Sequence, residues 1–521
     1  MKVISLLFCL LISNFSFATN YYVSALIGSD SYNGTTPTTP FYSLQKAADF
    51  TNPGDSVFVM NGTYTNSNPN SNVVGIYNSG TATNFITYKN YLNHNPVIQL
   101  ASNNWSGIAI QGADYIIIDG IKVIGDNDSI TLAYAQSQQN NTNNPATSGN
   151  GIGCASEYGN PSNKPHHITI QNCTVSKCGG GGIYSYNADY FTVKNNIVFE
   201  CGWYSPYGNS GISLYQNWNS DTSTEIKNFV VENTCYRNEN YVPFFAAGSI
   251  TDGNGIIIDD SRNTQNNSTL GVYLGKTLVA NNLVFDNGAR GIHCYESDNV
   301  LVVNNTSYKN CQSSSTQEGE LTAFSSGTIT FLNNIAFPDA SIPPIASFNA
   351  PNLIVSYNLW CQNYNLANPI GTNYLTGNPN FVLESSNPNL ANFQLQNSSI
   401  AINSGTLLNA PTLDKIGNPR IGAVDIGAYE NQNILNTLNY DYTIIKVVPN
   451  PTSSLITIQL SENISKDFII FISNSLGQNI ETIKKNSMNG KISIDLNSLS
   501  SGVYFISLND KKFKSIKIIK I

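Results

Sequence analysis

Six short runs, each opened by a glycine and continued by an isoleucine, recur along this chain and constrain its fold more than any other feature. They begin at Gly107, Gly151, Gly182, Gly211, Gly255 and Gly291, at intervals of about thirty to forty-five residues. None of these repeat units shows a sustained period of 3.6 residues, which argues against helical repeats. One repeat of this size cannot bury its own apolar face, so the repeats are expected to stack into a solenoid.

A second recurring unit lies between the glycine runs and consists of β-branched residues that end in asparagine. It occurs at residues 167–172, 191–196, 229–233, 277–282, 300–305 and 328–334. Most copies alternate apolar with polar residues, as a half-buried strand does. Asparagine tolerates the left-handed conformation of a tight corner, and stacked asparagines can hydrogen-bond along the ladder. Two short strands and a fixed corner per repeat predict an all-β fold, a right-handed parallel β-helix.

Composition limits the compartment and the partners of the protein. Only 11% of the residues are charged and the formal net charge is −8, although the segment from Asp441 onward holds ten Lys against six Asp or Glu. The rest of the chain is therefore strongly acidic, which argues against nucleic acid as a partner. Residues 1–18 have the short positive start, the apolar stretch and the small residue before the cleavage point that are typical of a signal peptide. We therefore expect export.

The cysteines are expected to be buried and free rather than paired. Nine are present, and Cys9 lies in the predicted signal peptide. Export permits a disulfide set among the other eight. However, Cys154 and Cys294 fall at the same inward position of the glycine runs, and Cys178, Cys201 and Cys311 follow asparagine-containing strands at a similar offset. Buried free cysteine behaves as a small apolar residue, which suits a stacked core.

The beginning of the chain resembles the opening of many secreted β-helix proteins. The resemblance is carried by the segments at 20–24, 28–31, 34–35, 40–41, 44–48, 53–55 and 62–64. Polysaccharide lyases of the family 9 pectate lyase type and several alginate lyase families share this opening. The resemblance implies a short helix at 44–50 that caps the first coil. Residues 417–420 and 425–430 resemble the motif that closes such β-helices.

The end of the chain resembles a type IX secretion sorting domain. The residues that carry this resemblance lie at 448–452, 476–478, 494–499 and 502–505, followed by a Lys-rich tail. The resemblance implies a small β-sandwich that directs export across the outer membrane through the type IX machinery. The expected organisation is a signal peptide at 1–18, a β-helix at 19–433, a linker at 434–446 and the sorting domain at 447–521. The protein is then secreted or attached to the cell surface.

Acidic residues gather around the fifth glycine run. Asp252 and Asn254 precede this strand, and Asp259 and Asp260 follow its isoleucines. Clustered carboxylate and amide oxygens suit Ca²⁺, so these four residues are candidate ligands of a calcium ion. The alternative is structural, in which Asp252 and Asn254 form a turn and Asp260 caps a corner.

The sixth glycine run adds basic groups one coil further on. Arg290 and His293 should lie about 5 Å from Asn254 and Ile257 across the sheet. The β-elimination of a uronate needs a neutralised carboxylate, a base and a proton for the leaving oxygen. Arg290, His293, Asp259 and, from a neighbouring strand, Lys276 are the candidate catalytic residues, and His293 is the easier base at neutral pH. The alternatives are an exposed column residue for His293 and a surface charge for Lys276.

Aromatic and polar side chains on the same strands are candidates for holding sugar rings. The predicted substrate-binding residues are Trp203, Tyr215, Arg262, Tyr295 and Glu296. Sugars stack on aromatic faces through their apolar surface, although a tyrosine stack can equally stiffen the sheet. The expected partner is an acidic polysaccharide, bound by a monomer.

Three functions follow from these features. The first is a polysaccharide lyase that cleaves a uronic-acid-containing glycan by β-elimination, which the family resemblance favours. The second is a glycoside hydrolase on the same fold, in which Asp259, Asp260 and Glu296 act as acid and base. The third is a surface solenoid, such as an adhesin, that binds a glycan without cleaving it.

Overall fold

The computed structural model describes residues 18–361, 371–432, 446–460, 465–474, 478–509 and 515–521. The chain divides into two compact units, Met1–Asn431 and Gln432–Ile521. The predicted linker at 434–446 and the predicted signal peptide, apart from their last residues, lie outside the described residues. Among the described residues, no helix combines the length and the apolar character needed to cross a membrane.

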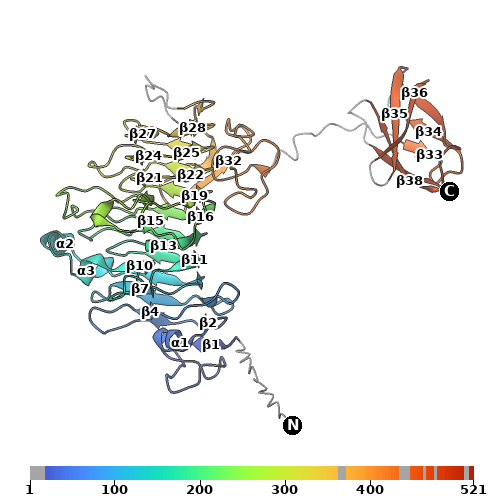
Figure 1. Cartoon of the computed structure of the whole chain (residues 1–521). Coiled ribbons are helices and arrows are strands. Elements are labelled where there is room, and N and C mark those ends of the chain that lie inside the picture. Colours follow the sequence, from blue (N-terminus) through green and yellow to red (C-terminus); the bar gives the residue numbers. More distant parts are fainter. Residues whose placement is uncertain (1–17, 362–370, 433–445, 461–464, 475–477, 510–514) are drawn as a thin grey trace, which may run out of the picture. The chain divides into compact units, whose positions relative to one another are not determined.

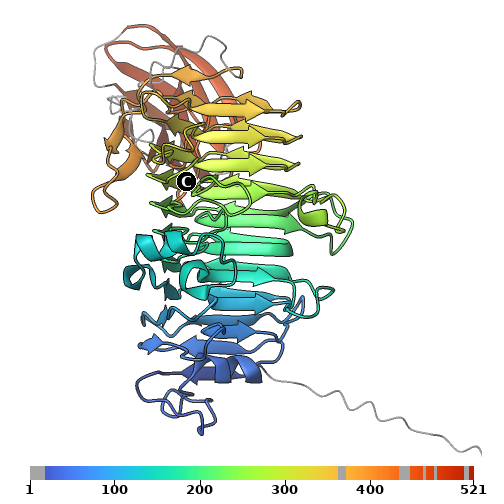
Figure 2. The same cartoon turned by 90° about the vertical axis from the view of Figure 1, so that its left-hand side faces the viewer.

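The first unit is the predicted parallel β-helix, whose strands stack coil upon coil (Figures 1 and 2). Three columns of strands run along it, here called sheets 1, 2 and 3. Sheet 1 contains β4 (Val74–Ile76), β7 (Ser106–Gln111), β10 (Asn150–Ala155), β13 (Ile183–Lys194), β15 (Ile212–Asn217), β18 (Ile256–Asp259), β21 (Ile292–Tyr295), β24 (Leu321–Phe324) and β27 (Ile345–Phe348).

Sheet 2 joins sheet 1 because β13 runs through the corner into both. Its other strands are β1 (Asn20–Val23), β2 (Ser56–Val59), β5 (Ile86–Asn90), β8 (Ile116–Asp119), β11 (His166–Gln171), β16 (Ile226–Val231), β19 (Lys276–Ala280), β22 (Val300–Val303), β25 (Ile329–Leu332) and β28 (Ile354–Ser356). Sheet 3 contains β3 (Thr63–Tyr64), β6 (Val97–Gln99), β9 (Lys122–Ile124), β12 (Thr174–Ser176), β14 (Ile197–Phe199), β17 (Thr234–Tyr236), β20 (Leu283–Phe285), β23 (Thr306–Tyr308), β26 (Ile335–Phe337), β29 (Leu359–Trp360) and β30 (Leu375–Thr376).

The six glycine runs become successive strands of sheet 1, from β7 to β21. Each glycine sits where the next coil comes close. A Cβ atom on Gly255 would lie 2.8 Å from the carbonyl oxygen of Gly291, which leaves no room for a larger residue. The isoleucines that follow alternate into the core, as Ile256 and Ile258 do in β18. The sequence repeat therefore reflects two constraints. Successive coils come close at the glycine, and the isoleucines that follow point alternately into the core.

The asparagines form the predicted hydrogen-bonded ladder at the corner that follows sheet 2. In each step the backbone N–H and the side-chain amide of one asparagine both donate to the Oδ1 of the next, as Asn233 does to Asn282 at 2.9 and 3.0 Å. The members of this first ladder are Asn196, Asn233, Asn282, Asn305, Asn334 and Asn358. The residue before the ladder position has a positive φ, 55° at Asn281, so asparagine also supplies the corner conformation.

A second, shorter ladder runs along the corner between sheets 3 and 1. Asn238 donates to Asn287, and Asn287 donates to Asn310. The backbone N–H of Asn310 then donates to Glu320 at 2.9 Å, so a buried carboxyl group ends this ladder. All eight cysteines outside the predicted signal peptide are buried and free, which confirms the expectation for them.

A capping helix, short inserted helices and turns, and one antiparallel strand pair are added to the coils of the β-helix. The predicted cap is α1 (Leu44–Phe50), which begins after Ser43 and packs Leu44, Ala47 and Ala48 into the core. Inserted into the wall are the short helices α2 (Leu132–Ser137) and α3 (Pro145–Ser148) and the 3-10 turns η1 (Asn127–Ser129) and η2 (Gln265–Asn267). The antiparallel pair β31 (Phe381–Leu383) and β32 (Asn392–Leu395) packs aromatic residues against the outer face of sheet 3.

The second unit contains two antiparallel sheets with a shared apolar core, as predicted for the sorting domain. One sheet contains β33 (Lys446–Val448), β34 (Leu455–Gln459) and β37 (Lys491–Asp495). The other contains β36 (Asn479–Asn486), β35 (Asp467–Asn474), β38 (Gly502–Leu508) and β39 (Ile516–Lys520). Ile456, Ile470 and Ile506 are among the core residues that the two sheets bury between them.

Candidate functional site

From Tyr186 to Phe324, one column of outward positions on sheet 1 is aromatic except at Asp259. Tyr186 pairs with Tyr215, Tyr215 with Asp259, Asp259 with Tyr295, and Tyr295 with Phe324. In the adjacent column Ile257 pairs with His293, and His293 pairs with Thr322. The expectation that Arg290 and His293 lie one coil beyond Asn254 and Ile257 is therefore confirmed.

Asp259 is a half-buried carboxyl group in the middle of this column. Its Oδ1 accepts a hydrogen bond of 2.9 Å from the side chain of Gln265 in η2. Burial, followed by the nearby charge of Asp252, raises the pKa of Asp259 well above its usual value. The environment thus favours the protonated acid, which is the form that can donate a proton.

Asp260 has a structural role at the corner that follows β18. Its φ is 50°, and its two oxygens accept hydrogen bonds from the backbone N–H of Thr264 and of Gln265, each at 2.8 Å. The side chains of Gln216 and Thr264 donate to the same carboxylate. The corner-capping alternative for Asp260 thus has direct geometric support.

Asp252 and Asn254 hold each other and the neighbouring coil. The Nδ2 of Asn254 donates to Asp252 at 2.8 Å and to Ser210 at 2.9 Å, and its Oδ1 accepts from the backbone N–H of Arg290. The described part of the chain holds no cluster of three His, Cys, Asp or Glu side chains placed to bind a metal ion. A calcium ion also takes amide, backbone and water oxygens, so calcium at the four predicted ligands stays a prediction.

His293 is a buried imidazole on β21. Its Nδ1 lies 2.6 Å from the Oγ1 of Thr322, and its ring lies against Phe324 with centroids 5.3 Å apart. Burial, with a smaller contribution from the Arg290 charge, holds the pKa of His293 well below its usual value. A neutral imidazole is the state in which histidine accepts a proton.

Arg290 precedes β21 and lies over the outward face of sheet 1. Its guanidinium centre is 5.7 Å from the centroid of the Phe324 ring. One nitrogen donates to the carbonyl oxygen of Thr251, and another forms an ion pair of 2.9 Å with Glu318. A cation, a neutral imidazole and a carboxyl group that favours its protonated form thus come from two adjacent strands of one sheet.

The other predicted residues are distributed around this centre. Tyr215 stacks on Tyr186 with centroids 5.3 Å apart and the planes 14° apart, and Tyr295 lies beside His293. Glu296 accepts a hydrogen bond from Thr264 at the corner, at 3.3 Å. The facing sides of the two stacked rings cover each other, and Tyr186 is the more exposed of the pair, with an exposed fraction of 38%.

Three predicted residues lie outside the two columns. Lys276 starts β19 and therefore belongs to sheet 2, where it is exposed. Arg262 forms a two-pronged contact with Asp298, 3.0 Å at each nitrogen. Trp203 donates to the carbonyl oxygen of Arg237 at the corner between sheets 3 and 1. Arg262 and Trp203 thus make contacts at corners of the β-helix, and Lys276 lies on sheet 2.

Sequence reasoning did not single out Glu318, Thr322, Phe324 and Gln265. Glu318 lies in the loop before β24. Glu320 stands directly before this strand, at the position that glycine occupies in the earlier coils. The glycine pattern therefore ends one coil too early to reveal this strand. The asparagine unit at 328–334 was the available signal, because each such unit follows a strand of sheet 1.

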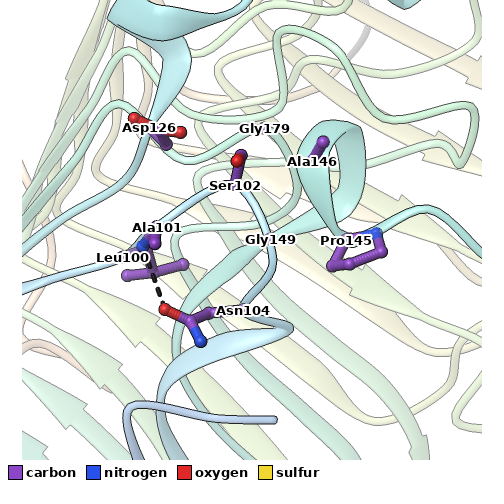
Figure 3. Close-up of a pocket in the computed structure, with 9 residues that line it drawn as sticks. All are labelled: Leu100, Ala101, Ser102, Asn104, Asp126, Pro145, Ala146, Gly149 and Gly179. Atoms are coloured by element: carbon purple, nitrogen blue, oxygen red, sulfur yellow. Dashed lines mark hydrogen bonds between the residues drawn. The ribbon is translucent and has the colours of Figure 1, made fainter. Parts of the chain in front are cut away.

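A small pocket lies elsewhere, at the corner near α3 (Figure 3). It is lined by Leu100, Ala101, Ser102, Asn104, Asp126, Pro145, Ala146, Gly149 and Gly179. Its volume is about 10 Å³, room for about one water molecule. The side-chain Oδ1 of Asn104 accepts a hydrogen bond of 2.9 Å from the backbone N–H of Ala101. None of the predicted site residues lines this pocket.

Comparison with known families and structures gives two matches to family models. Residues 21–322 match the model described as the Pel9A-like, right handed beta helix region. Residues 446–521 match the secretion system C-terminal sorting domain. No curated protein matches the sequence.

Similar solved structures include several β-helix enzymes. The crystal structure of pectate lyase Pel9A is 19% identical over 80% of this chain and 98% of its own, with a TM-score of 0.48. A GH136 lacto-N-biosidase from Eubacterium ramulus is 14% identical over 69% of this chain and 67% of its own, with a TM-score of 0.42. A rhamnogalacturonan lyase is 15% identical over 71% of this chain and 91% of its own, with a TM-score of 0.35.

Proposed function

Because the chain belongs to the Pel9A-like right-handed β-helix family, we propose that it is a secreted polysaccharide lyase acting on a uronic-acid-containing glycan. The bond is cleaved by β-elimination on the outward face of sheet 1. The C-terminal sorting domain marks the protein for export by the secretion machinery that reads it, so the enzyme meets its substrate outside the cell or at its surface.

One observation carries this proposal: the neutral His293 beside the Arg290 cation. Elimination requires a base for the proton next to the substrate carboxylate, and a positive group that stabilises the charge developing there. His293 would remove the proton, and Arg290 would hold the carboxylate. Asp259 lies diagonally across from His293 in the sheet, where a protonated carboxyl group can supply the leaving oxygen with a proton.

Hydrolysis is the second candidate, favoured by the acidic surroundings of Asp259. The charges of Asp252, Asp260 and Glu296 all contribute to raising the pKa of Asp259, so a carboxyl group that favours its protonated form lies close to three other carboxyl groups. Paired carboxyl groups of unequal acidity are what glycosidases use as acid and base. An acidic face also suits a neutral glycan better than a polyuronate.

The test is an incubation of the purified full chain with polygalacturonate, alginate and rhamnogalacturonan. Elimination produces an unsaturated uronate that absorbs in the ultraviolet, whereas hydrolysis gives new reducing ends without that absorbance. Unsaturated product supports the lyase, and reducing ends alone support the hydrolase. Binding without either product would leave a glycan-binding solenoid. A parallel set with EDTA tests the calcium prediction, because a lyase that needs the ion loses activity on chelation.

A further inference from the structure

The ion pair between Arg290 and Glu318 leaves hydrogen-bonding groups unused on both partners. Only one nitrogen of Arg290 contacts Glu318, at 2.9 Å. The Nε of Arg290 and the second oxygen of Glu318 are both buried without a hydrogen-bond partner. A buried polar group without a partner destabilises the folded state, so this contact is poorly satisfied as a purely structural one.

The two partners differ in how firmly they are held. The Arg290 side chain is 8% exposed and is fixed by the carbonyl oxygen of Thr251 and by the Phe324 ring. The Glu318 side chain is 37% exposed and lies on the loop between β23 and β24. Glu318 can therefore turn toward solvent while the guanidinium stays in place on the face of sheet 1.

A free carboxylate would satisfy the guanidinium better than Glu318 does. Arginine binds carboxylates through two parallel N–H donors, and the edge with the unused Nε–H offers such a fork. A hydroxyl group could accept from only one of these donors. The groups present on Arg290 therefore select a planar anion with two oxygens.

We infer that Glu318 is an internal competitor, whose carboxylate occupies the place on Arg290 that a carboxylate of the ligand takes. This inference rests on the proposed function, and it adds a residue that sets the affinity for uronates against neutral sugars. Glu318 must leave Arg290 before a uronate binds. Neutral sugars have no group that displaces it, so they bind independently of Glu318.

The test compares the full chain with its Glu318→Gln variant by titration calorimetry at low ionic strength. The probes are the trisaccharides of galacturonate, glucuronate and mannuronate, each with its methyl ester as the neutral counterpart. Glutamine keeps an acceptor for Arg290 but has no charge. We expect at least one free acid to bind the variant about two- to fivefold more tightly, the gain from losing one partly exposed competing ion pair. The methyl esters should bind equally.

Two variants serve as controls. Glu225→Gln removes the same charge at an exposed position before β16, and it should leave all affinities unchanged. Adding Arg290→Met to Glu318→Gln should abolish the gain. If Glu318→Gln lowers the melting temperature by several degrees, Glu318→Asp, which keeps the charge but withdraws it by one methylene, should give a smaller gain of the same sign.

The outcomes separate this inference from the proposed function. A gain for a free acid in a protein that forms no unsaturated product supports the competitor and refutes the lyase. Unsaturated product from a protein whose Glu318→Gln variant binds free acids no better refutes the competitor and leaves the lyase standing. Equal gains for acids and esters, or no binding of any uronate to either form, also overturn the inference.

Discussion

Lys227 and Arg290 are both buried cations of the β-helix, but their surroundings differ. The side chain of Lys227 is 0% exposed, and its Nζ contacts Asp189 at 2.5 Å and Asp221 at 2.8 Å. It also lies 4.5 Å from the ring centroid of Tyr190. Asp189 accepts further hydrogen bonds from Ser220 and Tyr273. Among the buried atoms without a partner in the described residues, Arg290 contributes its Nε, whereas Lys227 and Asp189 contribute none.

The difference separates a closed network from an open one. Around Lys227 each charge and each donor meets a partner within the protein, and such a network fixes a corner and its loops. Around Arg290 the positive charge has one ion-pair partner, and the Nε has no hydrogen-bond partner, among the described residues. This cation lies next to the neutral imidazole of His293 on the outward face of sheet 1. Burial of charge alone therefore does not identify a functional site here. A buried charge identifies a functional site when its hydrogen-bonding groups are incompletely satisfied and its ion-pair partner can move away.

The largest expected effect is on stability, at the closed network. Lys227→Met should lower the free energy of unfolding by about 4 kcal/mol, because Asp189 is left as a buried charge without its cation. Urea unfolding followed by tryptophan fluorescence measures this, since all four tryptophans lie in the first unit. Adding Asp189→Asn should restore a large part of the loss. A loss below about 1 kcal/mol in the single variant would show that the network is not closed.

Glu320 provides the next test, because it closes a network only two residues from Glu318. Burial raises the pKa of Glu320 to about 7 from 4.5. The folded state therefore prefers the protonated acid, so its contribution is complete below pH 4.5 and is lost as the pH rises through 7. The loss amounts to about 3 kcal/mol.

The pH dependence is best measured as a difference between two proteins. Glu320→Gln cannot titrate, so unfolding free energies of the natural chain minus those of this variant should fall between pH 4.5 and 7 and level off above. Other titrating groups, among them Asp425, cancel in the difference. A flat difference would mean that Glu320 is stabilised as a charged end of the ladder.

At the open network the effect should appear in activity rather than stability. Arg290→Met should reduce kcat/KM for an acidic glycan by about a hundredfold, or about 2.7 kcal/mol, because the group that holds the substrate carboxylate is gone. The cost in stability should be smaller than for Lys227→Met, since Glu318 can turn to water. The ultraviolet assay and urea unfolding on the same preparation compare the two. Unchanged kcat/KM would remove Arg290 from the site.

The repeats in the sequence made the fold predictable, and they are also the reason why the site was only partly visible. Glycine and asparagine mark corners, where local backbone conformation and the close approach of coils leave few alternatives. The strands and the register of β18 with β21 followed from them. In contrast, Glu318 and Gln265 reach the column from loops of irregular length. Nothing local in the sequence indicates where such a loop places its side chain.

Lys227 illustrates the same limit from the structural side. In the sequence it is one lysine in an alternating strand, where an exposed position is expected. Its burial follows from the loops that carry Asp221 and Tyr273, which fold over it. For Asp260 the sequence left two roles open, a calcium ligand and a corner cap. The structure gives it a positive φ, which turns its side chain into the corner.

The smallest effect is a gain in stability at the lower end of the first ladder. Cys173 occupies the ladder position below Asn196, and its backbone N–H already donates to the Asn196 Oδ1 at 2.9 Å. By the register of β8 with β11, an asparagine here would also reach the carbonyl oxygen of Ile118, as Asn196 reaches that of Ile170.

Cys173→Asn should therefore raise the free energy of unfolding by about 1 kcal/mol, the net value of a typical buried hydrogen bond. The backbone N–H of Ile121, which now meets the sulfur, would donate to the new Oδ1. Cys154→Asn is the matched control. That position faces the apolar core between Ile110 and Ser185 and does not belong to the ladder, so the same change should destabilise. If both variants destabilise equally, the ladder stabilises by packing rather than by its hydrogen bonds, and the contrast between closed and open networks loses its energetic basis.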